Sequence, residues 1–113
     1  MANWGVLGFG RMGLNFAEAM SEVSDSKLIS IASRSGKKYK NFENKSYDEI
    51  INNNNIDSVY ISTLNNAHIE LIDKLSESKK NILCEKPVSM YLNELIRVKK
   101  KIFENNVKFY EAI

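Results

Sequence analysis

A glycine-rich segment close to the first residue constrains the fold more than any other feature. It reads Trp4-Gly5-Val6-Leu7-Gly8-Phe9-Gly10-Arg11-Met12-Gly13, so a short apolar stretch leads into Gly-x-Gly-x-x-Gly, and a helical pattern follows. In a strand–turn–helix context, Gly8 makes the tight turn, Gly10 lets the backbone approach a pyrophosphate, and Gly13 lets the helix pack close to the sheet. The helix N-terminus offers free N–H groups and a positive dipole end to phosphates. The segment predicts a dinucleotide-binding unit; the alternative is a strand-to-helix turn without a ligand.

Strand and helix patterns alternate along the rest of the chain. The periodicity predicts strands over residues 3–8, 27–33, 58–63, 81–84 and 107–111, and helices over 11–24, 47–52, 67–79 and 91–105. The polar residues 34–46 leave room for only a short helical turn. Because such alternation produces a parallel sheet covered on both faces, we expect one α/β domain spanning residues 1–113.

The apolar residues of the long helices recur at helical spacing. The helix over 67–79 is expected to direct Leu71, Ile72 and Leu75 inward. The other two helices gather apolar residues on one side, which are Met12, Phe16, Ala17, Met20 and Val23 in the first, and Leu92, Leu95, Ile96, Ile102 and Phe103 in the last.

Composition excludes several classes of function. The 113 residues include 16 basic and 14 acidic side chains, a balance that gives no basic stripe for nucleic acid and no polybasic patch for a membrane. No apolar run approaches transmembrane length and no leader pattern precedes Trp4, so we expect a cytoplasmic protein. With one cysteine, Cys84, no intramolecular disulfide is possible, and one cysteine with one histidine cannot supply the ligands of a zinc site. Cys84 is expected to be buried.

The end of the second predicted strand carries an arginine where dinucleotide-binding folds usually place a carboxylate. That position, about 20 residues beyond the glycines, reads Ser33-Arg34, with Lys37 and Lys38 close behind. A carboxylate would repel a 2′-phosphate, whereas a guanidinium can bind it with two parallel hydrogen bonds. The site therefore favours NADP over NAD, although Arg34 could also be a solvent-facing charge.

Two further segments follow the ends of predicted strands, where open α/β sheets bind ligands. The first comprises residues 62–68. Its Thr63 and Asn65 could contact the cofactor, while His68, taken alone, is more typical of a packing or capping residue. The second reads Cys84-Glu85-Lys86-Pro87. Lys86 could orient a substrate hydroxyl or donate a proton if its pKa were lowered, but Glu-Lys-Pro alone is more typical of a surface loop.

Taken together, these segments resemble the N-terminal domain of the Gfo/Idh/MocA oxidoreductases, which include glucose–fructose oxidoreductase and inositol dehydrogenase. The resemblance spans essentially the whole chain and depends on the order and spacing of five matches. They are Gly8-Phe9-Gly10-Arg11-Met12-Gly13, Ala32-Ser33-Arg34, residues 56–63, Asn65 with His68, and Cys84-Glu85-Lys86-Pro87.

The resemblance implies a Rossmann domain, a doubly wound parallel sheet that binds a nicotinamide cofactor. It gives Lys86 a catalytic position beside the nicotinamide and substrate, lines the crevice with Asn65 and His68, and associates Ser33-Arg34 with NADP-using members. The expected cofactor-binding residues are Gly8, Phe9, Gly10, Arg11, Met12, Gly13, Ser33, Arg34, Lys37, Lys38, Thr63, Leu64, Asn65, His68, Glu85, Lys86 and Pro87.

The chain also departs from the family pattern. Leu64 stands where a proline is common, and the short stretch 35–46 reduces the usual second helix. The family's second domain, an antiparallel sheet that carries most of the substrate pocket, is expected to be absent. Its absence would expose apolar surface near the carboxyl end of the sheet and favour self-association.

The sequence therefore predicts the NADP(H)-binding domain of an oxidoreductase, with NAD as the other possible cofactor and no metal. Hydride transfer to or from a sugar, cyclitol or diol is expected only with the second domain, because that domain would hold the polyhydroxylated substrate. One alternative is a stand-alone nucleotide-binding or sensor module. Another is a Rossmann domain for a nucleotide-sugar or CoA, against which only Glu-Lys-Pro argues specifically.

Overall fold

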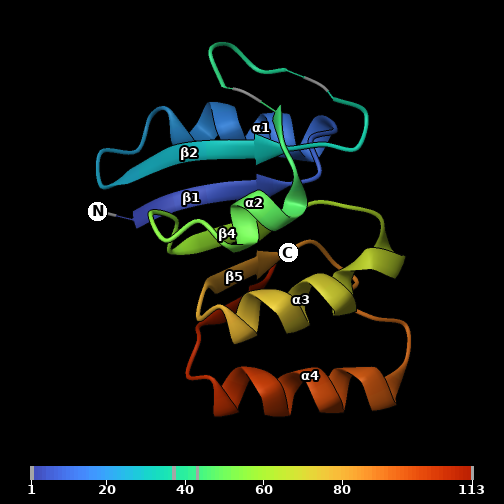
Figure 1. Ribbon diagram of the computed structural model, residues 1–113. Coiled ribbons are helices and arrows are strands. Elements are labelled where there is room, and N and C mark those ends of the chain that lie inside the picture. Colours follow the sequence, from blue (N-terminus) through green and yellow to red (C-terminus); the bar gives the residue numbers. More distant parts are fainter. Residues whose placement is uncertain (1, 37, 43, 113) are drawn as a thin grey trace.

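A parallel sheet forms the centre of the molecule, with helices on both faces (Figure 1). The computed structural model describes residues 2–36, 38–42 and 44–112. Within them the strands are β1 (Ala2–Leu7), β2 (Ser26–Ala32), β3 (Asn44–Lys45), β4 (Ser58–Ile61), β5 (Asn81–Cys84) and β6 (Phe109–Glu111). They lie in the order β3-β2-β1-β4-β5-β6, and all neighbouring strands are parallel. This order confirms the expected doubly wound Rossmann fold.

Helices connect the strands and divide between the two faces of the sheet. They are α1 (Arg11–Met20), α2 (Tyr47–Ile51), α3 (His68–Glu77) and α4 (Leu92–Glu104), and a 3₁₀ turn, η1 (Asn65–Ala67), leads into α3. Adjacent residues of β1 face opposite sides, because Val6 packs with α1 whereas Leu7 packs with α2 and α3. The sheet is therefore covered by α1 on one face and by the other three helices on the opposite face.

The position of β1 creates the place for a ligand. The chain runs from β1 outward to β2 and β3 on one side, and then crosses back to build β4, β5 and β6 on the other side. In open α/β sheets, the carboxyl ends of the two strands at such a switch point border a crevice that binds ligands. Here those strands are β1 and β4, which pair directly through Leu7 and Ile61.

Two local predictions need correction. The strand β3 is not predicted from the sequence, because Asn44 and Lys45 are polar and form a strand only by pairing with Ile31 and Ala32. The first helix ends at Met20 rather than at residue 24, where bonds from Glu22 N to Ala19 O (3.1 Å) and Val23 N to Met20 O (3.2 Å) tighten the chain into a turn. Val23, beyond the helix end, is exposed, and so is Met12 in the first turn of α1.

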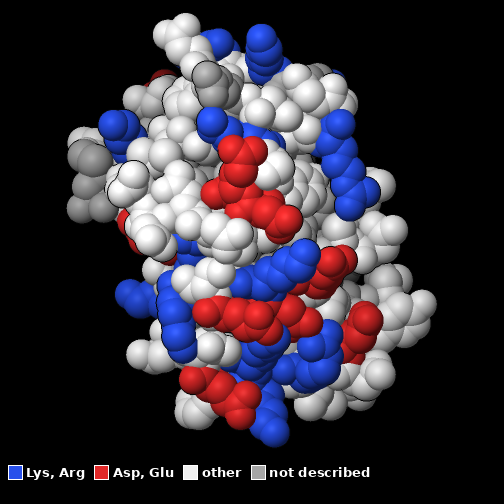
Figure 2. All heavy atoms as spheres, in the orientation of Figure 1, with Lys and Arg blue, Asp and Glu red and all other residues white. Residues whose placement is uncertain are grey.

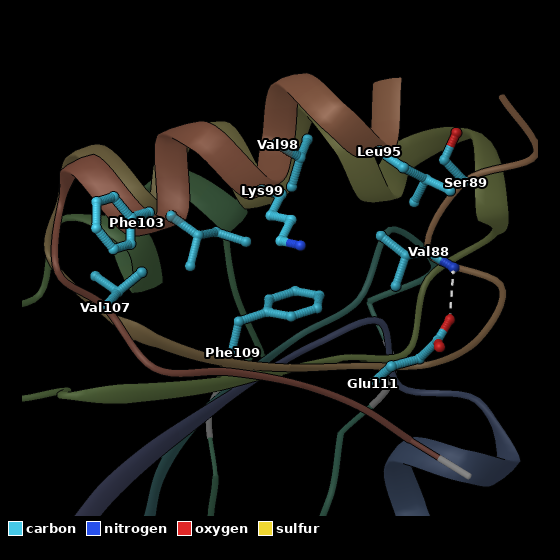
Figure 3. Close-up of a pocket in the computed structure, with 10 residues that line it drawn as sticks. Val88, Ser89, Leu95, Val98, Lys99, Phe103, Val107, Phe109 and Glu111 are labelled. Carbon is cyan, nitrogen blue, oxygen red and sulfur yellow. Dashed lines mark hydrogen bonds between the residues drawn. The ribbon is translucent and has the colours of Figure 1, made fainter. Parts of the chain in front are cut away.

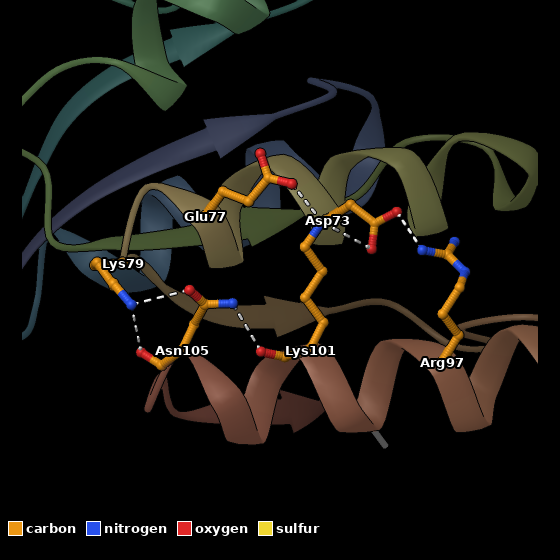
Figure 4. Close-up of polar contacts among 6 residues, drawn as sticks. All are labelled: Asp73, Glu77, Lys79, Arg97, Lys101 and Asn105. Atoms are coloured by element: carbon orange, nitrogen blue, oxygen red, sulfur yellow. Dashed lines mark hydrogen bonds and ion pairs between the residues drawn. The ribbon is translucent and has the colours of Figure 1, made fainter.

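The helix α4 lies outermost, beyond α3 (Figure 1). Its apolar side is only partly covered. Val98 is buried, but Leu92, Ile96 and Phe103 are 73%, 61% and 85% exposed. Polar side chains join the two helices instead (Figure 4). These contacts are Arg97 Nη1 to Asp73 Oδ2 (2.7 Å), Lys101 to Glu77, and Lys79 Nζ to Asn105 Oδ1 (2.9 Å). Figure 2 shows the resulting mixture of basic and acidic side chains over α3 and α4.

Candidate functional site

The three glycines of the motif have different surroundings. Gly8 has a φ of +89°, and a Cβ added there would lie 2.9 Å from the backbone nitrogen of Thr63. A Cβ on Gly13 would lie 2.6 Å from the carbonyl oxygen of Gly8, so α1 packs too closely on the turn for any side chain. By contrast, nothing lies within 4 Å of the Cβ position of Gly10. Packing therefore accounts for Gly8 and Gly13, whereas the open space beside Gly10 is available to a ligand.

The N-terminus of α1 points its free backbone donors at this space. Gly10 is the N-cap residue, so no side chain caps the helix, and its first turn has no acidic residue. The Leu14 N–H donates to the Gly10 carbonyl (3.0 Å), but no described group accepts from the N–H of Arg11, Met12 or Gly13. Unpaired donors and a positive dipole end are what a phosphate binds. The geometry thus fits the pyrophosphate of a dinucleotide.

The turn after β2 carries Arg34, and two residues from the next segment hold it in place. The Ser33 N–H donates to Asn44 Oδ1 (2.8 Å), and Asn44 Nδ2 donates back to the Ser33 carbonyl (3.1 Å). The guanidinium carbon of Arg34 lies 5.8 Å from the centre of the Tyr47 ring, within cation–π range. Tyr47 opens α2, whose start is fixed by a capping box between Ser46 and Glu49. Sequence reasoning did not identify Asn44 or Tyr47.

A cavity of about 300 Å³ joins the glycine turn to this arginine. It lies at the carboxyl ends of β1, β2 and β4. Its lining consists of Gly8, Phe9, Gly10, Ser33, Arg34, Ser35, Tyr47, Ser62, Thr63, Leu64, Asn66 and Ala67. A phosphate-binding helix end at one side and a guanidinium at the other suit an adenine nucleotide with an additional phosphate.

His68 lies between the loops that follow β4 and β5. Its side chain is fully buried, with Nδ1 2.9 Å from the Pro87 carbonyl oxygen and Nε2 3.2 Å from the Thr63 carbonyl oxygen. Lys86, which precedes a cis peptide bond to Pro87, is exposed. Among the described residues, no side chain forms a hydrogen bond or an ion pair with the Lys86 ammonium. It is therefore available to a ligand.

Cys84 is fully buried at the end of β5, as expected from the sequence. Burial raises the pKa of its thiol to about 12, and the carboxylates of Glu111 and Glu85 contribute to the increase. Because the thiolate is the reactive form, this cysteine is inert near neutral pH. It does not act as a nucleophile with His68, whose ring nitrogens contact backbone carbonyls instead.

Comparison with known proteins decides what kind of domain this is. The model of the Gfo/Idh/MocA family, an oxidoreductase family with an NAD-binding Rossmann fold, matches residues 2–112. The chain belongs to this family. Two curated relatives are similar to it: a trans-1,2-dihydrobenzene-1,2-diol dehydrogenase from Xenopus tropicalis, 31% identical over 96% of this chain, and a myo-inositol 2-dehydrogenase from Thermotoga maritima, 32% identical over 83%. The crystal structure of an NAD-binding protein from Listeria innocua shares the fold, with a TM-score of 0.89, 24% identity and 98% coverage.

The chain spans about a third of these proteins. It covers 36% of the diol dehydrogenase, 30% of the inositol dehydrogenase and 35% of the Listeria protein. It is therefore equivalent to the NAD-binding part of a Gfo/Idh/MocA oxidoreductase, and the remaining two thirds of the relatives have no counterpart in the 113 residues.

The structure brings together only some of the residues that the Gfo/Idh/MocA resemblance implied. Seven of the residues expected to bind the cofactor line the cavity, namely Gly8, Phe9, Gly10, Ser33, Arg34, Thr63 and Leu64. Others lie outside its lining, namely Arg11, Met12, Gly13, Lys38, His68, Glu85, Lys86 and Pro87. Lys37 and the side chain of Asn65 lie outside what the structure describes. Contact of each residue with a cofactor remains a prediction.

A second hollow lies away from the glycine turn, between α4 and β6 (Figure 3). It has a volume of about 650 Å³, and apolar side chains such as Val98, Ile102 and Phe109 form most of its walls. Lys99 points into it, while Glu111 accepts a hydrogen bond from the Val88 N–H (3.2 Å). This groove has no phosphate-binding helix end, and we do not assign the cofactor to it.

The described residues offer neither a membrane span nor a cluster of metal ligands. No described helix is long and apolar enough to cross a membrane. In the same part of the chain, no three His, Cys, Asp or Glu side chains are grouped so that they could hold a metal ion. The location in the cytoplasm remains a prediction.

Proposed function

We propose that this chain is the NADP(H)-binding part of an oxidoreductase that transfers hydride between nicotinamide and a hydroxyl-bearing or carbonyl carbon of a sugar, cyclitol or diol. The observation that carries the proposal is the open space beside Gly10, faced by the free donors of α1 at the switch point of the sheet. When bound there, a nicotinamide dinucleotide would supply the hydride chemistry, and the protein would supply its position.

Different residues of the crevice would bind the two halves of the cofactor. The Arg34 guanidinium, at the end of β2, would bind the adenosine half and its 2′-phosphate, so the proposal favours NADP(H) over NAD(H). The nicotinamide half would then lie across the switch point, beside the ends of β4 and β5. Lys86 follows β5 and would orient a substrate hydroxyl or exchange its proton.

The class of substrate is proposed from the relatives. The two curated proteins act on a dihydrodiol and on myo-inositol, so a small polyhydroxylated compound is the natural candidate. Because the chain spans only about a third of those proteins, we propose that substrate binding needs a further domain or partner. Apolar side chains of α4 such as Phe103 are exposed, and we propose that the isolated chain self-associates through them.

Calorimetric titration with NADP⁺ tests the proposal directly. Wild-type protein should bind, whereas Gly10→Val should not, because its side chain would occupy the space proposed for the pyrophosphate. The variant should retain its fold by circular dichroism, since nothing lies within 4 Å of the Gly10 Cβ position. Binding by folded Gly10→Val would place the pyrophosphate elsewhere, and failure of the wild type to bind any nicotinamide dinucleotide would end the proposal.

A stand-alone nucleotide-binding or sensor module is the second candidate. The position of Lys86 favours it, because the lysine that the catalytic proposal requires lies outside the lining of the cavity between the glycine turn and Arg34. The coding DNA beyond residue 113 distinguishes the two. A continuing frame that encodes a sheet-forming domain supports the oxidoreductase, and a stop codon supports the module.

A further inference from the structure

The environment of His68 is unusual for a residue that only fills space. Its ring is fully buried, yet both nitrogens face backbone carbonyl oxygens, of Pro87 at 2.9 Å and of Thr63 at 3.2 Å. A carbonyl oxygen only accepts hydrogen bonds. A neutral imidazole has one N–H and donates to one of the two oxygens, and an imidazolium donates to both. In either state the ring ties a loop carbonyl to the first residue of α3.

The two carbonyls belong to the two loops that border the nicotinamide half of the proposed site. Thr63 lies between β4 and η1, and Pro87 lies between β5 and α4. The second loop is held at two other points, because the Glu85 N–H donates to the Ile61 carbonyl (2.9 Å) and the Val88 N–H donates to Glu111 Oε2 (3.2 Å). Lys86 lies between these anchors.

We infer that His68 is a positioning residue: its Nδ1–H donates to the Pro87 carbonyl, the shorter of the two contacts, and holds the Glu85–Val88 loop to the start of α3. This bond fixes the backbone from which Lys86 reaches the nicotinamide. The inference rests on the proposed function for the role of Lys86, but the tether itself depends only on the contact between His68 and the Pro87 carbonyl. A displacement of about 1 Å at a reacting group can lower a rate a hundredfold, so fixing this loop matters for transfer.

The test compares wild-type protein with His68→Phe by NMR on the full ¹⁵N-labelled chain. Phenylalanine keeps the ring volume but has no N–H donor, so the amide of Val88 should exchange with solvent about tenfold faster. The amides of β1 and β2 should change by less than twofold. Leu75→Ala is the matched control, because Leu75 is also buried on α3 but contacts neither loop carbonyl through a hydrogen bond. It should accelerate exchange throughout the sheet instead.

Titration with NADP⁺ supplies the second readout. In the wild type, we expect the amide signals of both halves of the crevice to shift, at Gly10 and Ser35 and also at Lys86 and Val88. In His68→Phe, the first pair should still shift and the second should not. Wild-type exchange at Val88 in the variant, or acceleration equal to that of β1, would overturn the inference. If wild-type protein shows no shifts with NADP⁺, the proposed function fails. The exchange rate of the Val88 amide still tests whether His68 holds the loop.

Discussion

Arg34 is the residue that would set the choice between two cofactors differing by one phosphate. Its guanidinium rests near the Tyr47 ring and lines the cavity, with no carboxylate at the end of β2 to oppose a 2′-phosphate. A hydrogen bond between charged groups contributes about 1.5–3 kcal/mol, so NADP⁺ should bind about tenfold or more tightly than NAD⁺. Arg34→Asp should reverse this preference. Calorimetry with both cofactors measures it, and equal affinities in the wild type would remove Arg34 from the site.

An added methyl group should lower stability at Gly13 but not at Gly10. Gly13→Ala places a Cβ 2.6 Å from the Gly8 carbonyl oxygen, so α1 must move, and the free energy of unfolding should fall by about 1–3 kcal/mol. Gly10→Ala meets no atom within 4 Å and should change stability by less than about 0.5 kcal/mol. Urea unfolding of both variants makes the comparison. A stable Gly13→Ala protein would contradict the close packing of α1 on the turn.

The sequence allowed part of this site to be predicted, because some of its features are local. The glycines lie within one strand–turn–helix unit, and the position of Arg34 follows from the end of the next strand. Asn44 and Tyr47 were missed because they reach the Arg34 turn only through the pairing of β3 with β2. The tether of His68 was missed because its partners are backbone carbonyls, 5 and 19 residues away, which no side-chain pattern reveals.

At the scale of elements, Lys80 connects the start of β5 to the loop before β4. Its buried ammonium donates to the carbonyls of Asn53 (2.8 Å) and Ile56 (2.7 Å). Burial lowers the pKa of Lys80, and the carboxylate of Asp57 opposes this effect. Lys80→Met removes a donor from these buried carbonyls, so the free energy of unfolding should fall by about 1–2 kcal/mol at pH 7.

The same substitution should reveal a pH dependence. The folded chain releases the Lys80 proton at lower pH than the unfolded chain, so the unfolded state binds more protons between the two pKa values. The free energy of unfolding of the wild type should therefore rise, relative to Lys80→Met, as pH approaches the ordinary value of 10.5. Urea unfolding at several alkaline pH values measures this, with the exposed Lys108→Met as control. A difference that shrinks with rising pH would contradict the lowered pKa.

Elements were predictable where a pattern alone decides them. The strands of the sheet centre are short apolar runs, and α3 buries the predicted Leu71, Ile72 and Leu75. The contacts of α4 were not predictable. Helical spacing shows that Leu92 and Phe103 lie on the same side of the helix, but it does not show which residues pack against that side. That depends on Asp73 and Glu77 of α3, which hold Arg97 and Lys101.

At the scale of the whole molecule, the chain should bind its cofactor without turning over a substrate. Orientation contributes about 7–11 kcal/mol to lowering a barrier in favourable cases, and one exposed lysine, Lys86, does not by itself hold a whole substrate against the nicotinamide. We expect no NADPH formation from sugars, cyclitols or diols. Adding the part of a relative that this chain does not span should restore activity, which Lys86→Ala should then abolish with little loss of cofactor affinity. Steady turnover by the isolated chain, dependent on Lys86, would be the contrary result.

Self-association is the second expectation at this scale. Phe103 is 85% exposed and borders the groove between α4 and β6, so it is the side chain most costly to leave in water. Phe103→Glu should shift sedimentation equilibrium towards monomer, whereas the exposed Lys108→Glu should not. A wild-type chain that is monomeric at concentrations of about 100 μM would contradict the proposed contact.

The central place of β1 has a consequence for how the chain is made. During synthesis, β1 can pair with β2 early, but its other edge waits for β4, since Trp4 pairs with Ser58. No other neighbouring pair of described strands is separated by as much chain. Until that long loop closes, an apolar strand presents an unpaired edge to other nascent chains, the condition that promotes aggregation. The crevice lies at this same joint between β1 and β4. A nucleotide bound across it would therefore stabilise the pairing of β1 with β4. This is the strand pairing whose formation costs the most loop-closure entropy.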